Sequence, residues 1–356
     1  MELWISCRMT HVFSLAHLLG IGGADELVDH GVEGLTGKLR DSHHGGWFTS
    51  VDANRPADGD KGGYEHAFVL LAAASAEAAG HPQAGPLLND ALSVHDRWFW
   101  DDEYGMVVDR WDRSFARLDP YRGINANMHT VEAYLAVGDV TGERLWHQRA
   151  LRIAHRMIDA ARTNDWRIPE HYDQSWRPRL DHNRDRPDDR FRPYGATVGH
   201  GLEWARLLLH LHASTPEQGG ELVKAAVGLF DRAVGDGWHV DGAPGFVYTT
   251  DWDGAPIVTS RLHWVLTEAI NAAAALQLAT GDRRYARWYD TWWEYAETYL
   301  IDRKSGSWHH ELDATNHPAA QIWEGKPDVY HALQAALIPQ LPLAPSLAVS
   351  LARGRH

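Results

Sequence analysis

The stretch Gly195–His212, GATVGHGLEWARLLLHLH, anchors the interpretation of the whole chain. Small residues lead into His200, Glu203 follows three positions later, and leucines then repeat at the spacing of one helical face. Residues three apart lie on the same side of a helix, so Glu203 is expected to orient the His200 imidazole. An isolated HxxE is more often a helix start with an incidental carboxylate, so the rest of the chain has to decide between these two interpretations.

On both sides of this stretch, helices of modest length alternate with loops rich in Gly, Asp, Pro and Trp. The other expected helices are Thr10–Leu19, Gly31–Leu39, Tyr64–Ala79, Pro86–Trp100, Asn125–Ala136, Glu143–Thr163, Pro216–Val234, Ser260–Thr280, Asp282–Leu300 and Asp328–Pro339. Such helix pairs cannot bury their apolar faces alone and must stack on neighbours, in an open solenoid or a closed ring. The long Trp-bearing loops favour the ring, an all-α toroid of helix hairpins with short β segments in its loops, one of them at residues 46–51.

Composition and charge narrow the function classes. The 356 residues suit one large closed architecture, which we expect as a single catalytic domain over residues 1–345 with a loose C-terminal tail at 346–356. A formal net charge of −14 without a Lys/Arg cluster argues against nucleic acid or an anionic membrane surface as partner. No apolar run approaches the roughly 18 residues of a membrane span. The oligomeric state stays open.

The single cysteine, Cys7, can form neither an internal disulfide nor a thiolate metal cluster, which fits a reducing compartment. The first twenty residues carry Glu2 and Arg8 and no small-residue cleavage site, so they do not resemble a signal peptide. We therefore expect a soluble cytoplasmic protein.

Tryptophan and histidine are unusually frequent, with 17 and 23 copies. The indole face suits the C–H faces of sugar rings as well as it suits protein cores. Histidines stand at or near the start of several expected helices: His129 with Glu132, Asn125 and Asn127; His263 with Trp264 and Glu268; and His331 in KPDVYHALQAAL.

Several chemistries compete for these residues. A divalent metal is disfavoured, because carboxylates are few per site and the His/Glu order is the reverse of the ExxH motif in di-iron bundles. No GxSxG is present for a nucleophile, and no carboxylate pair is singled out for glycoside hydrolysis. Two histidines suit the removal and return of a proton alpha to a carbonyl.

Seven ordered motifs together resemble the N-acylglucosamine 2-epimerase superfamily, most closely its branch of aldose-ketose isomerases acting on mannose and sulfoquinovose. They are RMTHVFSLAHLLG, GGWFTSVD, NANMHTVEAY, GHGLEWARLLL, SRLHWVLTEAI, GSWHHELD and KPDVYHALQ, and they span nearly the whole chain. The resemblance implies an (α/α)6 barrel, no metal or organic cofactor, and interconversion of an aldose with its 2-ketose through a cis-enediol.

Residue roles follow from the resemblance by position. His200 and His331 match the acid/base pair, and Glu203 matches the residue that supports the first of them. The expected substrate-binding residues are Arg8, Tyr64, Asn125, His129, Trp264, Glu268, Trp308 and Trp323. Which histidine acts first as base stays open.

The substrate that the resemblance favours is a monosaccharide, D-mannose with D-fructose as product. The alternatives are a 2-epimerase of a neutral or N-acyl sugar, a sulfoquinovose isomerase, and a non-isomerase toroid that binds or hydrolyses sugars. The chain departs from the family pattern at Gly62 and Glu65, and it has one helix fewer before RMTHVF. We therefore expect uncovered apolar surface on the first helix, at about 25 cal/mol per Å². Either the natural start lies upstream of Met1, which we favour, or the protein is a shortened form.

Overall fold

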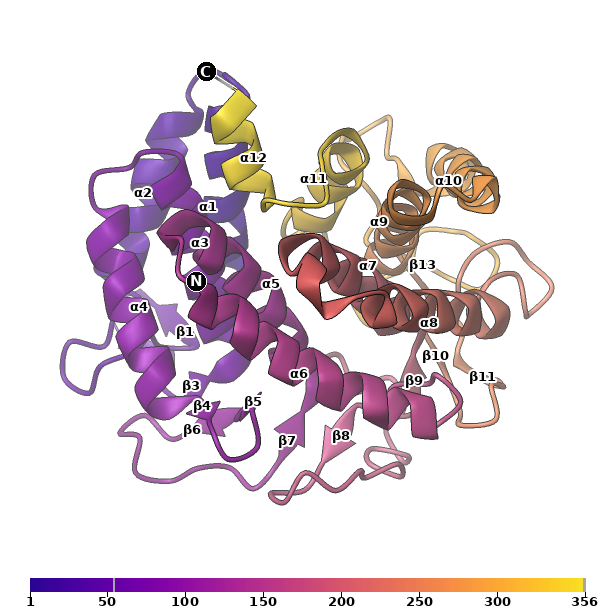
Figure 1. Cartoon of the computed structure of the whole chain (residues 1–356), viewed down its shortest axis with the longest axis horizontal. Coiled ribbons are helices and arrows are strands. Elements are labelled where there is room, and N and C mark those ends of the chain that lie inside the picture. Colours follow the sequence, from indigo (N-terminus) through magenta and orange to yellow (C-terminus); the bar gives the residue numbers. More distant parts are fainter. Residues whose placement is uncertain (54, 355–356) are drawn as a thin grey trace. The chain divides into compact units, whose positions relative to one another are not determined.

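The computed structural model describes residues 1–53 and 55–354, in which α-helices are joined by loops with short strands (Figure 1). Asn54 and the last two residues of the expected tail, 355–356, lie outside the described residues. The chain divides into two compact units, Met1–Ala154 with Ala344–His356, and His155–Leu343. The single catalytic domain expected over residues 1–345 stays a prediction. Among the described helices, none combines the length and the apolar character needed to cross a bilayer.

The first unit is built on two buried helices, α3 and α5, which pack against each other. Its helices are α1 (Leu3–Leu18), α2 (Ala24–Thr36), α3 (Gly63–Ala78), α4 (Ala84–Trp98), α5 (Ile124–Thr141), the first part of α6 (Arg144–Thr163) and α12 (Leu347–Gly354). α3 also contacts α1 and α4, and α12 returns to pack against α1, α3 and α5 (Figure 1). Helices buried on nearly all sides need no polar face, which is why α3 is rich in alanine and leucine.

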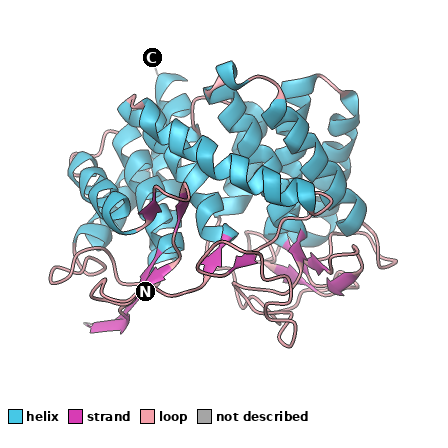
Figure 2. Cartoon of the chain, turned by 60° about the horizontal axis from the view of Figure 1, so that its bottom comes forward, coloured by secondary structure: helices cyan, strands magenta, loops and turns pink. Residues whose placement is uncertain are grey.

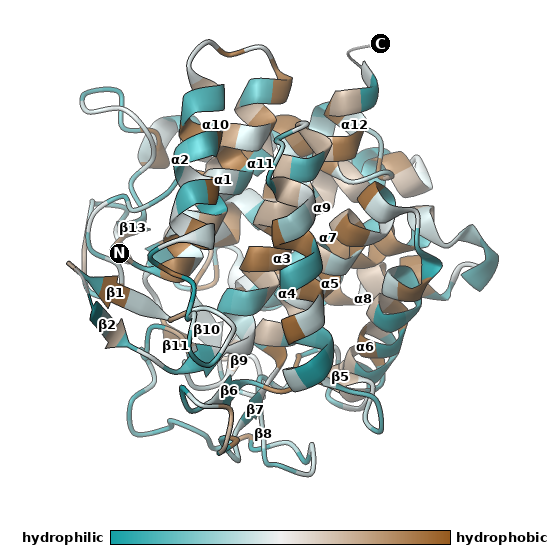
Figure 3. Ribbon diagram, turned by 90° about the vertical axis from the view of Figure 1, so that its left-hand side faces the viewer, coloured by the Kyte–Doolittle hydropathy of each residue, from teal (hydrophilic) through white to brown (hydrophobic). Residues whose placement is uncertain are grey.

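α4 shows how an outer helix differs from these inner ones. Leu87, Leu88, Ala91 and Val94 recur at the spacing of one helical face and are buried, while the opposite face is polar. Figure 3 shows hydrophilic and hydrophobic residues side by side on α4. The helix therefore covers the inner layer with one face and meets solvent with the other.

The second unit has the same arrangement of buried inner helices covered by outer helices. Its helices are α7 (Val198–Ser214), α8 (Glu221–Gly237), α9 (His263–Thr280), α10 (Arg283–Tyr295) and α11 (Tyr330–Leu337), with short turns η1 (Pro216–Gln218), η2 (Ala296–Leu300) and η3 (Ile338–Gln340). α7 and α9 pack against each other and are buried on most sides. α8 packs on α7, and α10 and α11 pack on α9.

A two-residue strand stands directly before each of the four most buried helices. These strands are β3 (Lys61–Gly62), β7 (Arg122–Gly123), β9 (Ala196–Thr197) and β12 (Arg261–Leu262). The others are β1 (Ser50–Asp52), β2 (Arg55–Asp58), β4 (Trp100–Asp101), β5 (Met106–Val107), β6 (Arg110–Trp111), β8 (His171–Tyr172), β10 (Thr249–Thr250), β11 (Pro256–Val258) and β13 (Glu311–Leu312). Antiparallel pairing joins β3 to β6, β9 to β10 and β12 to β13. The paired strand fixes the first turn of the helix that follows, and Figure 2 shows these strands at the ends of the helices.

Three expected elements differ from the observed ones. α1 begins at Leu3 rather than Thr10, and α2 begins at Ala24 rather than Gly31. Gly31 and Gly34 weaken the helix signal of α2, and Gly31 is a close-packing position against Thr10 of α1. The expected strand at 46–51 reduces to β1, which pairs with β2.

The C-terminal segment forms a helix where a loose tail was expected. α12 buries Ala348 and Val349, and the Ser346 backbone N–H donates to Asp139 Oδ2 at 2.6 Å. An eight-residue helix directly after a Pro-rich loop gives too short a pattern for its periodicity to be noticed.

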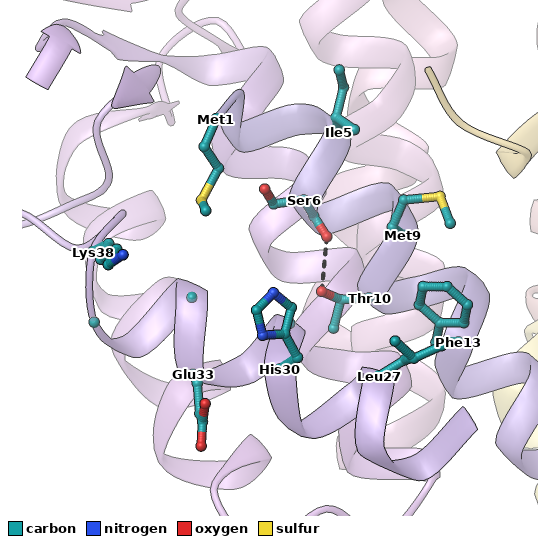
Figure 4. Close-up of a pocket in the computed structure, with 13 residues that line it drawn as sticks. Met1, Ile5, Ser6, Met9, Thr10, Phe13, Leu27, His30, Glu33 and Lys38 are labelled. Atoms are coloured by element: carbon teal, nitrogen blue, oxygen red, sulfur yellow. Dashed lines mark hydrogen bonds between the residues drawn. The ribbon is translucent and has the colours of Figure 1, made fainter. Parts of the chain in front are cut away.

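An open pocket of about 520 Å³ lies along α1 and α2 (Figure 4). Ile5, Met9 and Phe13 of α1 and Leu27 of α2 line it, in agreement with the expected uncovered apolar surface on the first helix. None of the residues expected to bind or transform substrate lines this pocket.

Two glycines of α2 provide a matched test of the α1–α2 contact. A Cβ on Gly31 would lie 2.2 Å from Thr10 Oγ1, whereas a Cβ on Gly34 would meet nothing within 4 Å. We expect Gly34→Ala to stabilise the protein by up to about 1 kcal/mol through helix propensity. We expect Gly31→Ala to destabilise it by about 1–3 kcal/mol through overpacking. Urea unfolding followed by circular dichroism measures both, and equal stability of the two variants would contradict this account of the contact.

Candidate active site

His200 lies in the first turn of α7, directly after β9, whose pairing with β10 holds the start of the helix. The His200 Nδ1 lies 2.9 Å from Glu170 Oε2, and both side chains are buried. A carboxylate can only accept, so Nδ1 carries the proton and Nε2 presents its lone pair. His200 is thereby held in the tautomer that a general base needs.

Glu203 has a different partner from the one that the HxxE spacing predicts. It is buried, and its Oε1 lies 3.5 Å from Arg206 Nη2. The prediction that Glu203 orients His200 is therefore wrong, because Glu170 bonds the imidazole and Glu203 instead balances the charge of Arg206. Glu170 was missed because it stands thirty residues before His200, in a loop with many acidic residues and no periodicity.

His331 lies in the first turn of α11, and its Nδ1 lies 3.0 Å from Glu268 Oε1. Glu268 is fully buried, and its other oxygen accepts from Arg206 Nε at 2.8 Å. Glu268 was expected to bind substrate, but burial and these two partners make it the support of His331 instead. His331 is thus held in the same tautomer as His200.

The start of α11 is fixed by a second set of bonds. The His310 imidazole stacks on His263, with 3.9 Å between ring centroids, and its Nε2 lies 3.1 Å from the Asp328 carbonyl. The Asp328 carboxylate accepts from the Tyr330 backbone N–H at 3.0 Å. These contacts position the turn that carries His331, and sequence reasoning had not singled out His310.

Trp264 lies against both imidazoles. Its ring centroid is 5.4 Å from that of His200 and 5.9 Å from that of His331, with tilts of 39° and 34°. Tyr248 meets the indole edge-on at 6.0 Å. Trp264 thus lies beside the two histidines, and its expected place in a pocket wall stays a prediction.

The other two expected tryptophan walls have structural contacts of their own. Trp308 is buried and packs edge-on against Trp293 of α10 at 5.8 Å. Trp323 lies under the Arg190 guanidinium at 3.8 Å, and its backbone N–H donates to Glu311 Oε2. These contacts give Trp308 a place in the helix packing and Trp323 a place in a loop contact, and a role in substrate binding stays a prediction for both.

In the first unit, three of the predicted binding residues lie together. Arg8 Nη2 donates to the Tyr64 hydroxyl at 3.0 Å, and its guanidinium lies over the Trp4 and Phe68 rings. The Tyr64 ring contacts His129 edge-on at 5.2 Å. Arg8, Tyr64 and His129 form a cationic and aromatic group that suits hydroxyl binding.

The two amides in the NANMH stretch have different roles. Asn127 bonds the Val107 backbone N–H and the Gly123 carbonyl, so it fastens the start of α5. Asn125 Oδ1 is buried and has no hydrogen-bond partner among the described residues. Asn125 is therefore the amide available to a ligand.

His129 Nδ1 and Glu132 Oε2 lie 3.7 Å apart, the spacing that an HxxE helix predicts. The absence of a resident metal and cofactor stays a prediction.

The chain is similar to known proteins over nearly its whole length. The sequence pattern described as N-acylglucosamine 2-epimerase (GlcNAc 2-epimerase) matches residues 1–335. The chain belongs to this family. A D-mannose isomerase from Thermobifida fusca is 54% identical over 98% of this chain and 86% of its own length. One from Pseudomonas cannabina pv. alisalensis is 49% identical over 98% of this chain and 85% of its own.

Solved structures extend this comparison to the fold. A crystal structure of D-mannose isomerase superposes with a TM-score of 0.89 at 29% identity, covering 96% of this chain and 87% of that one. A cellobiose 2-epimerase from Spirochaeta thermophila superposes with a TM-score of 0.83 at 19% identity, covering 100% of this chain and 87% of that one. The all-α (α/α)6-barrel fold class predicted for this member of the N-acylglucosamine 2-epimerase family is confirmed.

Other histidines of this N-acylglucosamine 2-epimerase family member belong to its core. His95 is fully buried in α4, and its Nδ1 lies 3.1 Å from the Tyr134 hydroxyl. Burial lowers the pKa of His95 from 6.5 to about 3, so it stays neutral in the folded protein. Because the unfolded chain takes up this proton first, the histidine makes stability fall as the pH drops from about 6.5 toward 3.

We expect His95→Gln to reduce this pH dependence by about one proton, or about 1.4 kcal/mol per pH unit within that window. The variant loses packing at pH 7, and its disadvantage shrinks as the pH falls. Urea unfolding at a series of pH values measures the slope. His155→Gln, on the exposed face of α6, is the matched control. An unchanged slope in His95→Gln would contradict the neutral core histidine.

Proposed function

We propose that the protein is a sugar isomerase that interconverts D-mannose and D-fructose by proton transfer at His200 and His331. The observation that carries the proposal is the pair of buried imidazoles, each bonded through Nδ1 to a carboxylate and both lying against Trp264. The D-mannose isomerases at 54% and 49% identity support the choice of sugar.

The reaction only relocates hydrogen. In the open-chain aldose the C2–H and O2–H bonds break, and C1–H and O1–H bonds form by way of a cis-enediol. One imidazole takes the C2 proton at Nε2 and a protonated imidazole supplies the proton needed at C1 or oxygen. The step has no net oxidation beyond the exchange between C1 and C2, so these residues can perform it without a cofactor.

The two supporting carboxylates have different surroundings. Glu170 Oε1 is buried without a hydrogen-bond partner among the described residues, so the hydrogen bonding of this side chain is directed to His200. Glu268 shares its charge between His331 and Arg206, and Arg206 also meets Glu203. Both carboxylates stabilise an imidazolium formed during the reaction, as the aspartate of a serine-protease triad does. We propose Glu203 as an indirect member of this network.

The sugar-binding residues proposed are Arg8, Tyr64, Asn125, His129 and Trp264. The buried, unbonded Asn125 Oδ1 and the contact of Arg8 with Tyr64 support this choice. The substrate class is a small-molecule monosaccharide. A cytoplasmic location is proposed on the single, buried Cys7, which fits a reducing compartment.

Removing either imidazole should stop the reaction. We expect His200→Ala and His331→Ala each to lose at least about 10²-fold to 10⁴-fold in kcat, the contribution of a general acid or base. His129→Ala is expected mainly to raise KM. Purified wild type is incubated in D₂O with mannose, glucose, fructose or sulfoquinovose, and NMR identifies the products. Formation of ketose with deuterium at C1 supports the proposal. A 2-epimer alone, no exchange at C2, or full activity in either alanine variant would overturn it.

Glu170→Gln tests the tautomer argument. The amide can donate to His200 Nδ1, which moves the ring proton to Nε2 and removes the base, as in a triad whose aspartate becomes asparagine. We expect kcat to fall by about 10²-fold or more while KM stays within a few-fold. Glu143→Gln, an exposed carboxylate in the loop between α5 and α6 of the first unit, is the control. Wild-type kcat in Glu170→Gln would show that the bond to Glu170 has no part in catalysis.

A further inference from the structure

The indole of Trp264 contacts the two proposed proton-transfer residues at the same time. Centroid separations of 5.4 and 5.9 Å are within the contact range of aromatic rings. Trp264 stands at the start of α9, whereas His200 begins α7 and His331 begins α11. The rigid indole of Trp264 therefore contacts an imidazole from each of two other helices. Neither imidazole can move toward the indole without displacing the indole.

The position of the Trp264 indole depends on the absence of a side chain at Gly199. A Cβ built on Gly199 would lie 2.3 Å from Trp264 Cζ3, 2.6 Å from Cη2 and 3.0 Å from Cε3. The six-membered ring of the indole therefore rests directly on the backbone of α7. A glycine inside a helix costs about 1 kcal/mol relative to alanine, so helix formation gives no reason for it here. Close packing of the indole does give one.

Each imidazole is held at one edge by its carboxylate, and the indole packs against its ring. The Nδ1 atoms are tied to Glu170 and Glu268, and each of these bonds permits the ring to swing about it. Proton transfer needs the reacting atoms within about 3–3.5 Å and aligned, so a small swing is costly for the rate. Packing against the indole restricts that swing for both rings.

We propose that Trp264, seated on the bare Cα of Gly199, is a positioning residue that fixes the imidazoles of His200 and His331 relative to each other. This inference rests on the proposed isomerase function. It differs from a role as a sugar-binding wall alone, since a wall contributes mainly to KM and a positioning residue mainly to kcat.

Gly199→Ala tests the contact between Gly199 and the Trp264 indole without removing any functional group. The added methyl displaces the indole, while alanine favours the helix, so we expect a folded protein. With mannose as substrate we expect kcat to fall at least about tenfold and KM to change less than about threefold. Gly235→Ala in α8, where a Cβ would meet nothing within 4 Å, is the matched control and should keep wild-type kinetics.

A second variant makes the test reciprocal. Phenylalanine lacks the outer ring that the methyl would meet, so Gly199→Ala/Trp264→Phe should have a higher kcat than Gly199→Ala alone. This non-additive recovery measures the coupling between the two sites directly. Circular dichroism confirms that each variant is folded.

The outcomes separate the inference from the function on which it rests. If the wild type does not convert mannose, the proposed function is wrong. If the wild type is active and Gly199→Ala keeps its kcat, or raises only KM, the positioning role is wrong. If the double variant is no better than Gly199→Ala, the indole and Gly199 are not coupled and the inference is overturned. If Trp264→Phe alone retains the full wild-type kcat, the indole is likewise not needed for positioning.

Discussion

The fully buried carboxylate of Glu268 is the group on which the second unit's site depends. Removing an ion from water costs several kcal/mol unless partners replace the lost hydration. His331 Nδ1 and Arg206 Nε supply those partners at 3.0 and 2.8 Å. Arg206 is itself buried, and the carboxylate of Glu203 also balances its positive charge. Helices α7, α9 and α11 are thereby joined by one charge network, and breaking any member leaves an uncompensated ion in the interior.

The site residues stand at helix starts, where short strands and loops hold the first turn of each helix. His200 and His331 lie in the first turns of α7 and α11, and Trp264 in that of α9. The short strands β9 and β12 pair just before α7 and α9, so their first turns are tied to neighbouring loops. For α11, the hydrogen bond from the Tyr330 backbone N–H to Asp328 and the contact of His310 with the Asp328 carbonyl hold the first turn in the same way. The helices carry the two proposed proton-transfer histidines, and the loops supply partners such as Glu170 that orient their side chains.

The sequence predicted the helices better than their partners. Segments such as α3, α7 and α9 could be placed because they are long runs of good helix formers, mainly alanine and leucine. The start of α2 could not, since Gly31 and Gly34 weaken the helix signal and the close packing of Gly31 depends on Thr10, which lies elsewhere in the chain. The site shows the same limit. His200 and His331 were found by motif resemblance, but the carboxylate on each imidazole lies 30 or 63 residues away, a distance that no helical period encodes.

The kind of hydrogen-bond partner distinguishes the site histidines from those of the core. His66 bonds the Gly62 carbonyl, His171 the Pro193 carbonyl and His95 the Tyr134 hydroxyl, all of which are uncharged. Burial then dominates, and it lowers the pKa of these three imidazoles to about 3 or 4. His200 and His331 instead face carboxylates, whose charge can stabilise the imidazolium that a proton transfer creates. In a chain with 23 histidines, burial alone therefore does not identify a base, and the carboxylate within 3.0 Å of Nδ1 is what sets His200 and His331 apart from these three core histidines.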